Sequence, residues 1–305
     1  MAVTGAAGFL GSHLCERLVA DGHEVLGIDS FTRFYPRSLK ERNVAALRGA
    51  PGFRLVEADA ATVNLRGTDA LVHLAGRPGV RSGTPALFER ANVRLTEALA
   101  SSGVPRLVLA SSSSVYEPAP GAVDEEAPLR PVSDYGRSKL AAERAAARIA
   151  RERGAELVTL RYFTLYGPRQ RPDMAFSRFA AAALGGPPAP LNGDGRQVRD
   201  FTYVGDAVDA TVRALHGAPA GAVYNVGGGA PARLADALAL IARAAGAPAL
   251  LDARPADPRE PRATAACIAR ARADLGWRPR VALAEGITRQ VAWVGAAGAL
   301  DTLGV

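Results

Sequence analysis

A glycine-rich turn between a short apolar strand and a helix is the feature that most constrains the fold of this chain. Gly5, Gly8 and Gly11 are spaced Gly-x-x-Gly-x-x-Gly directly after the apolar segment Ala2–Thr4. Such a turn lets the backbone approach a pyrophosphate, and the helix that follows presents the positive end of its dipole. This context, a strand before the turn and a helix after it, predicts a dinucleotide-binding βαβ unit.

Short apolar segments alternate with amphipathic segments through the first half of the chain, a pattern typical of helices packed on a parallel sheet. The predicted helices cover residues 12–21 and 133–153. The predicted strands cover residues 2–4, 24–28, 54–57, 70–74, 106–110 and 156–161. We therefore predict an α/β fold: a Rossmann-like doubly wound parallel sheet with a smaller, discontinuous C-terminal lobe that binds the substrate.

The composition changes after Gly167, where proline, arginine and glycine surround one predicted helix at 176–184. Segments 199–204 and 222–226 are predicted to be strands that return to the first domain. From residue 248 onward, prolines precede two amphipathic helices. The predicted nucleotide-binding domain is therefore 1–167 with 199–227, and the predicted substrate-binding lobe is 168–198 with 228–305.

The composition argues against several kinds of partner. The net charge is +7, but most arginines alternate with glutamates along predicted helices, as on a solvated face, so we expect no nucleic-acid partner. No apolar segment is long enough to cross a bilayer without charge, so we expect no membrane association. Cys15 and Cys267 provide no disulfide framework, and we expect both to be packing residues in a cytoplasmic protein.

Tyr135 and Lys139 indicate the chemistry. Four residues apart on a helix, they lie on one face. A phenol with an ordinary pKa of about 10 beside a cation is expected to favour the phenolate, which is a base for an alcohol proton. Together with a hydride acceptor in the glycine turn, this base implies oxidation of a carbinol. The hydroxyls of 111–114, at the end of a predicted strand, are candidates to bind the reacting alcohol.

Four other polar residues have either a functional or an ordinary structural role. Asp29 lies at the end of the second predicted strand, where an acidic side chain accepts hydrogen bonds from the adenosine ribose. The same acid repels a 2′-phosphate, so NAD is favoured over NADP. Arg33 nearby is an opposing signal, because it could bind such a phosphate. Asp59 follows the third strand, where a carboxylate either meets the adenine amine or belongs to a polar turn. We expect His73 to be a satisfied core histidine, and Asn92 to have a structural role near the active site.

These motifs together resemble the extended short-chain dehydrogenase/reductases along almost the whole chain. The likeness is carried by Thr4-Gly5-Ala-Ala-Gly8-Phe-Leu-Gly11, His73-Leu-Ala75, the serines with Val115-Tyr116, Tyr135-Gly-Arg-Ser-Lys139, Arg199-Asp-Phe-Thr-Tyr-Val204, Tyr224-Asn-Val-Gly227 and Leu275-Gly-Trp-Arg-Pro279. Within this family, segments 29–43, 78–81 and especially 161–175 look like the UDP-glucuronate 4-epimerase branch.

The resemblance implies NAD as cofactor, a UDP-sugar as substrate, a homodimer and no metal site. It places the catalytic groups at Ser112, Tyr135 and Lys139. The cofactor contacts that it implies are Gly5, Gly8, Phe9, Leu10, Gly11, Asp29, Asp59, Ala60, Leu74, Ala75, Tyr135, Lys139 and Tyr162. The substrate contacts that it implies are Arg81, Ser112, Ser113, Thr164, Arg171, Arg199 and Glu260, of which Arg171 matches the arginine that holds the sugar carboxylate.

The resemblance also narrows the reaction. Relatives that are 4,6-dehydratases carry an Asp-Glu pair where Ser113 and Ser114 stand, and relatives that decarboxylate UDP-glucuronate carry a glutamate in place of Ser114. Eliminating water needs a further general acid and base, which hydroxyls supply poorly near neutral pH. We therefore expect an NAD-dependent isomerase that inverts C4 of UDP-glucuronate to UDP-galacturonate through a transient 4-keto intermediate.

Three alternatives stay open. The first is a 4-epimerase of an uncharged sugar, UDP-glucose/galactose or an acetamido sugar, in which Arg171 is a surface or phosphate arginine. The second is a dehydratase or decarboxylase in which Glu117, standing where the family has glycine, replaces the missing acid. The third is a non-catalytic NAD(P)-sensing protein. This alternative is disfavoured because such proteins typically lose the Tyr-Lys pair, whereas Tyr135 and Lys139 are both present here. Glu260 also departs from the family, which has a shorter Asp there.

Overall fold

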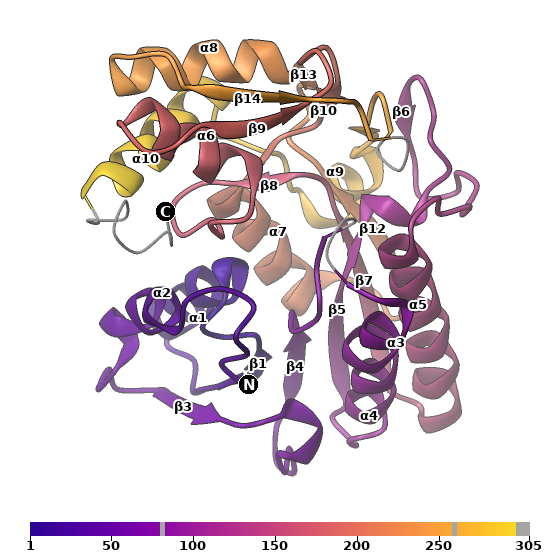
Figure 1. Cartoon of the computed structure of the whole chain (residues 1–305). Helices are drawn as coiled ribbons and strands as arrows, with labels where there is room; N and C mark the ends of the chain where they lie inside the picture. The colour runs from indigo at the N-terminus through magenta and orange to yellow at the C-terminus, as the bar shows by residue number, and fades with distance from the viewer. Residues whose placement is uncertain (80–82, 258–260, 297–305) are drawn as a thin grey trace.

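A seven-stranded parallel sheet forms the centre of the computed structural model, which describes residues 1–79, 83–257 and 261–296 (Figure 1). The strand order is β12-β7-β5-β4-β1-β2-β3, and every neighbouring pair is parallel. These strands are β1 (Ala2–Thr4), β2 (Val25–Asp29), β3 (Phe53–Glu57), β4 (Ala70–His73), β5 (Arg106–Ser112), β7 (Glu156–Tyr162) and β12 (Val223–Val226). The predicted doubly wound sheet is confirmed, and its strand order reverses beside β1.

Helices cover both faces of this sheet because successive strand residues point to opposite sides. Val108 packs into a core with one helix layer, whereas Leu107 and Leu109 pack into a core with the other. The first layer contains α1 (Phe9–Ala20) and α7 (Val204–Gly217), and the second contains α4 (Leu95–Ala100) and α5 (Asp134–Arg153). Shorter helices in the connections are α2 (Arg37–Asn43), η1 (Ala45–Leu47), η2 (Ala60–Thr62), α3 (Pro85–Phe88), the π-helix η3 (Glu89–Arg94) and η4 (Ser113–Val115).

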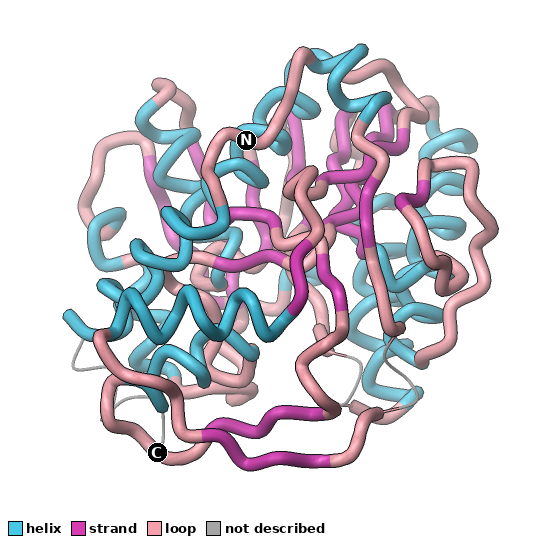
Figure 2. The backbone as a smooth tube through the Cα atoms, turned by 90° about the horizontal axis from the view of Figure 1, so that it is seen from above, coloured by secondary structure: helices cyan, strands magenta, loops and turns pink. Residues whose placement is uncertain are grey.

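A second apolar core, which includes Tyr166, Phe179, Ile241 and Ile287, belongs to a smaller lobe. Its helices are α6 (Ala175–Ala183), α8 (Leu234–Ala245) and α10 (Leu283–Ala296). Two-stranded pairs lie with it: β9 (Ala189–Asn192) with β14 (Leu251–Arg254), β10 (Val198–Arg199) with β13 (Ala232–Arg233), and β11 (Thr202–Tyr203) with β8 (Leu165–Tyr166). A further pair, β15 (Ala265–Ala266) with β6 (Ala122–Val123), packs beside Tyr116 and Phe163 instead. Figure 2 shows this lobe from above, with the β9–β14 pair at its rim.

Two predictions about these segments differ from the structure. The strand predicted at 199–204 is divided into two short strands, β10 and β11, of which β11 pairs with β8 inside the predicted first domain, and Phe201 between them packs in the small-lobe core. The later helix α9 (Ala269–Leu275), predicted to belong to the small lobe, packs on the large core through Ala271, Leu275 and the following Trp277. The rest of the two-lobe division stays our proposal.

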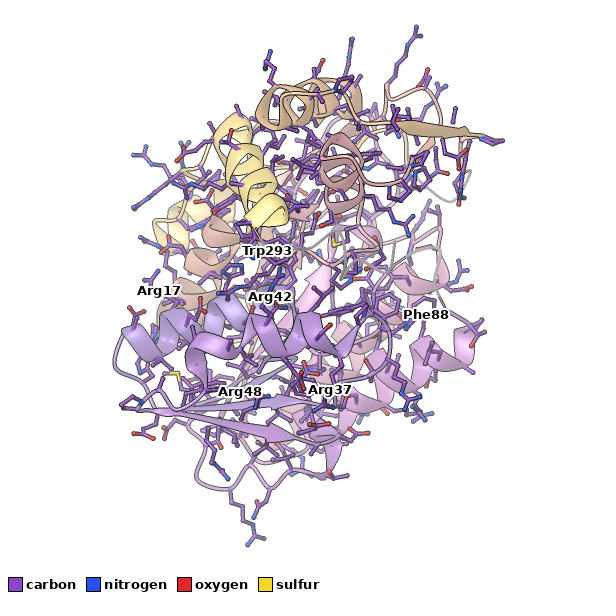
Figure 3. The ribbon with its side chains drawn as sticks, turned by 60° about the vertical axis from the view of Figure 1, so that its left-hand side comes forward. Arg17, Arg37, Arg42, Arg48, Phe88 and Trp293 are labelled. Atoms are coloured by element: carbon purple, nitrogen blue, oxygen red, sulfur yellow. The ribbon has the colours of Figure 1, made fainter. Side chains whose placement is uncertain are left out.

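The two lobes meet beside the first helices of the chain. The guanidinium of Arg42 lies 4.4 Å from the ring centre of Trp293 on α10, and Figure 3 shows the two side chains facing one another. Arg169 pairs with Glu16 at 2.7 Å. None of the helices in the described ranges has the length and apolar character that crossing a bilayer requires.

A buried ion pair fastens α5 to the sheet. Arg161 on β7 donates from Nε and Nη2 to the two carboxylate oxygens of Glu143 on α5, at 3.0 and 2.8 Å. Its Nη1 donates to the Tyr116 hydroxyl and to the carbonyl of Glu125. The side chains of Arg161 and Glu143 are only 4% and 9% exposed, so neither charge has water as a substitute partner.

We predict that Glu143→Gln lowers the free energy of unfolding by about 3 kcal/mol, because it leaves the Arg161 charge buried without its counter-ion. Urea denaturation measures this loss. Glu152→Gln on the same helix is the matched control: Glu152 pairs with Arg148 in the open, with both side chains 57% exposed, and its loss should leave the urea midpoint unchanged. Equal midpoints for the two variants would contradict the prediction.

Candidate active site

The glycine turn has the shape that a dinucleotide pyrophosphate needs. Gly5 has a φ of +71°, and a Cβ there would lie 3.0 Å from the Ala75 amide nitrogen. A Cβ on Gly11 would lie 2.0 Å from the carbonyl oxygen of Gly5, so the turn can close only on glycine. Helix α1 then begins at Phe9 and Leu10 with no side chain capping its first turn, which leaves its amides available to a phosphate. These residues fit NAD.

Asp29 lies at the end of β2, beside this turn. Its Oδ1 accepts from the Phe31 amide at 2.8 Å and from Lys40 Nζ at 3.0 Å. Its Oδ2 accepts from the Ala7 amide at 3.1 Å and keeps a second acceptor position, which suits a ribose hydroxyl. Asp29 therefore both fixes the turn and fits its predicted role in cofactor binding.

The remaining cofactor candidates differ in what they offer. Asp59 is exposed and caps η2 by accepting from the Ala61 amide, so the polar-turn role is present in the structure. Ala60 is buried in the core behind it, and Leu74 is partly buried against the large core. Tyr162 lies in the large core with its hydroxyl 2.7 Å from that of Thr211, so its side chain has a partner within the protein.

Tyr135 lies in the first turn of α5, close to the end of β5. Helix α5 begins there because Ser133 caps it, its hydroxyl accepting from the Gly136 amide. Burial raises the pKa of Tyr135, while a hydrogen bond with Ser112 and the charge of Arg171 lower it. The ring of Phe88, labelled in Figure 3, lies 6.0 Å from that of Tyr135.

Lys139 is held by the sheet next to the Tyr135 helix turn. Its Nζ donates to the carbonyl of Ala110 on β5 at 2.7 Å, and burial lowers its pKa to about 8, against the raising effect of Glu143. In the protein alone, burial raises the pKa of Tyr135, while Ser112 and Arg171 lower it. That Lys139 favours the phenolate stays a prediction.

The serine segment lies where strand β5 ends. Ser112 Oγ accepts from the Ser114 amide at 3.1 Å, which leaves its own proton for Tyr135. Ser113 lines a small cleft together with Glu117, Phe163 and Thr264. The cleft therefore joins the residue after the predicted catalytic serine to residues of the C-terminal segment.

Arg171 comes from the loop between β8 and α6, which belongs to the small lobe. Its Nε and Nη2 donate to the two oxygens of Asp173 at 2.9 and 3.0 Å. Its guanidinium lies 5.5 Å from the ring centre of Phe34, in the loop after β2. The tertiary structure thus brings a small-lobe arginine into the electrostatic neighbourhood of Tyr135, 36 positions earlier in the chain.

The other substrate candidates that the structure describes have hydrogen bonds within the protein. Thr164 is half-buried, and its carbonyl accepts from the Thr202 amide. Arg199 Nη1 donates to the carbonyl of Val198 at 2.9 Å. Arg81 and Glu260 lie outside the described residues. The individual binding roles stay predictions.

His73 and Asn92 have the structural roles that the sequence predicts. The Thr96 hydroxyl donates to the Asn92 carbonyl, so His73 Nε2 donates to Thr96 and His73 Nδ1 accepts from Thr4. Burial and the charge of Lys139 lower the pKa of His73 to about 3, which keeps the ring neutral. Asn92 binds both backbone groups of Arg77 and the Ser138 hydroxyl.

Two features of the site were missed in the sequence. The first is Glu143, which holds the helix of Tyr135 on the sheet through Arg161. Glu143 follows Lys139 by four residues and so lies on the same helix face, and this spacing could have indicated its role. The ring centre of Phe34 lies 3.7 Å from the guanidinium of Arg77 and 5.5 Å from that of Arg171. These contacts join distant segments, so no local pattern indicates them.

Comparison with known proteins shows the family of this chain. The model of the NAD dependent epimerase/dehydratase family matches residues 1–227. A Bacillus subtilis protein named uncharacterized UDP-glucose epimerase YtcB is 39% identical, over 96% of both chains. A probable UDP-glucuronate 4-epimerase of Rhizobium meliloti is 33% identical, over 95% of both. The crystal structure of a Bacillus cereus UDP-glucuronic acid 4-epimerase, in complex with UDP-glucuronic acid and NAD, superposes with a TM-score of 0.93 at 35% identity, covering 97% of this chain and 98% of that one.

The fold and the site define a nucleotide-binding α/β enzyme with a Tyr-Lys pair at the carboxyl edge of its sheet. The chain belongs to the NAD dependent epimerase/dehydratase family. The predicted fold, the predicted NAD cofactor and the predicted epimerase class are confirmed by this membership and by these relatives.

We predict that Gly136→Ala lowers kcat by at least about tenfold, because the new Cβ would lie 2.2 Å from the Ser114 carbonyl oxygen and displace Tyr135 from Ser112. Steady-state epimerisation rates measure the loss. Gly217→Ala, at the end of α7, is the control, since a Cβ there meets nothing within 4 Å. Unchanged kcat in Gly136→Ala would show that the close approach of α5 to the serine loop is not required.

Proposed function

We propose that this protein is a UDP-glucuronate 4-epimerase with Tyr135 as its base. The observation that carries this proposal is that the charge of Arg171 acts on the Tyr135 hydroxyl. In a hexuronate the carboxyl group is attached to C5, next to C4. An arginine that binds this carboxylate near Tyr135 therefore brings the C4 hydroxyl towards the base.

The chain supplies the proton transfers of the proposed reaction. Tyr135 removes the proton of the C4 hydroxyl, and Ser112 donates to the phenolate that acts as base. Protonated Lys139, held by the Ala110 carbonyl, adds positive charge to the site. Bound NAD supplies the acceptor and donor of the C4 hydride. After the 4-keto sugar turns about its diphosphate link, Tyr135 returns the proton to the C4 oxygen.

Arg171 has a second task in this proposal. A 4-keto uronate is a β-keto acid, which loses CO₂ readily. A planar guanidinium that binds both carboxylate oxygens can hold the group away from the orientation that decarboxylation needs. Serines at 113 and 114, in place of carboxylates, supply no acid-base pair for dehydration.

Epimerisation of UDP-glucose is the second candidate. The Bacillus subtilis relative at 39% identity carries a UDP-glucose name, and Asp173 already pairs with Arg171. Incubation with UDP-glucuronate and UDP-glucose in separate reactions, with the product sugars resolved, distinguishes the two. Preferred conversion of UDP-glucose would reject the glucuronate proposal.

We predict that Tyr135→Phe lowers the epimerisation rate about 10³-fold while NAD and UDP-sugar remain bound, because only the proton-transferring oxygen is removed. Rates are measured with saturating substrate, and bound cofactor is measured after release by denaturation. Undiminished inversion at C4 would end the proposed mechanism.

Arg171→Met should weaken UDP-glucuronate binding by more than it weakens UDP binding. It should also move the acidic limb of the kcat–pH profile to higher pH, because Arg171 lowers the pKa of Tyr135 and the base must be deprotonated. Arg178→Met, an exposed arginine on α6, is the control. Equal loss of both ligands would reject the carboxylate role.

A further inference from the structure

The Tyr35 hydroxyl is buried and makes no hydrogen bond within the described part of the chain. Leaving such a group without a partner costs about 1–3 kcal/mol, and folded proteins retain few of them. A buried hydroxyl of this kind is therefore a candidate for a partner that is not part of the protein.

Tyr35 lies in the loop that follows β2, next in sequence to Phe34, whose ring contacts Arg171. The ring centre of Phe34 lies 3.7 Å from the guanidinium of Arg77 and 5.5 Å from that of Arg171. Lys40 Nζ lies 5.3 Å from the centre of the Tyr35 ring. The loop is thus held by cations from the first domain and from the small lobe.

The Tyr35 hydroxyl shares the electrostatic surroundings of Arg171. Burial raises the pKa of Tyr35, the carboxylate of Asp29 raises it further, Arg171 lowers it and Asp173 raises it. The net effect keeps the hydroxyl protonated, so it is a hydrogen-bond donor throughout the neutral range.

Arg171 retains part of its donor capacity for a ligand. A guanidinium has five N–H donors, and the ion pair with Asp173 uses one on Nε and one on Nη2. The hydrogens of Nη1 and the second hydrogen of Nη2 are left for an end-on contact with a carboxylate. Such a contact leaves further lone pairs on the carboxylate oxygens.

We propose that Tyr35 is a further substrate-binding residue, whose buried hydroxyl donates a hydrogen bond to the sugar carboxylate that Arg171 binds. This inference rests on the proposed function. It makes the loop after β2 a determinant of uronate over neutral sugar, because a hexose with CH₂OH at this position offers no charged acceptor.

Tyr35→Phe tests the proposal by removing one oxygen. Because the oxygen has no hydrogen-bond partner among the residues that the structure describes, the urea midpoint should stay unchanged or rise. The Kd of UDP-glucuronate, measured by calorimetry, should rise about tenfold or more, the effect of losing a hydrogen bond to a charged group. The Kd values of UDP and UDP-glucose and the content of bound NAD should stay unchanged.

Tyr166→Phe is the matched control. The Tyr166 hydroxyl is also buried without a partner, but it lies in the small-lobe core against Gly286. Its removal should leave the Kd of every ligand unchanged. A control that weakens UDP-glucuronate binding as much as Tyr35→Phe does would overturn the assignment, because the effect would then be one of general packing.

Four results for Tyr35→Phe overturn the proposal: unchanged UDP-glucuronate binding, equal weakening for UDP, loss of bound NAD, or a lower urea midpoint. The second and third would assign the hydroxyl to the nucleotide or the cofactor, and the fourth to the fold. Failure of the proposed function is visible separately, since wild-type protein would then show no preference for UDP-glucuronate over UDP-glucose.

Discussion

The buried guanidinium of Arg161 is the contact on which the geometry of this site depends. It ties α5 to β7 through Glu143 and reaches the segment after η4 through the Tyr116 hydroxyl. Tyr116 in turn donates to Asn225 on β12, at 2.6 Å. A charge buried this deeply tolerates few alternative arrangements, because each hydrogen bond lost leaves part of it unsolvated. The helix that carries Tyr135 and Lys139 is therefore held rigidly on the sheet.

The same contact fixes the helix that carries the proposed base. Burial raises the pKa of Tyr135, and the opposing influences of Ser112 and Arg171 come from two different lobes. Lys139 is bound to the Ala110 carbonyl. Positive charge that enters the site with NAD⁺ would favour the phenolate of the proposed base. The strength of this base would then depend on the presence of the cofactor.

Residues from two parts of the chain come together near the proposed base. Arg171 comes from the small lobe, and its guanidinium lies 5.5 Å from the ring centre of Phe34 in the loop after β2. Arg42 and Trp293 join the same two parts of the chain. In the proposed function the residue that binds the sugar carboxylate is not the residue that transfers the proton. Recognition of the sugar charge and the Tyr135 chemistry would then depend on different residues.

The sequence by itself determined the parallel sheet, the glycine turn and the Tyr135 helix, because each is encoded by local periodicity, capping or spacing. It did not show that the strand predicted at 199–204 is divided into two short strands, because their partners, β13 and β8, lie far away in sequence. Only the tertiary structure decided the surroundings of the base. Lys139 meets a backbone carbonyl and Arg171 becomes the influential cation, because burial and long-range contacts, which depend on the packing of distant segments, set these electrostatics.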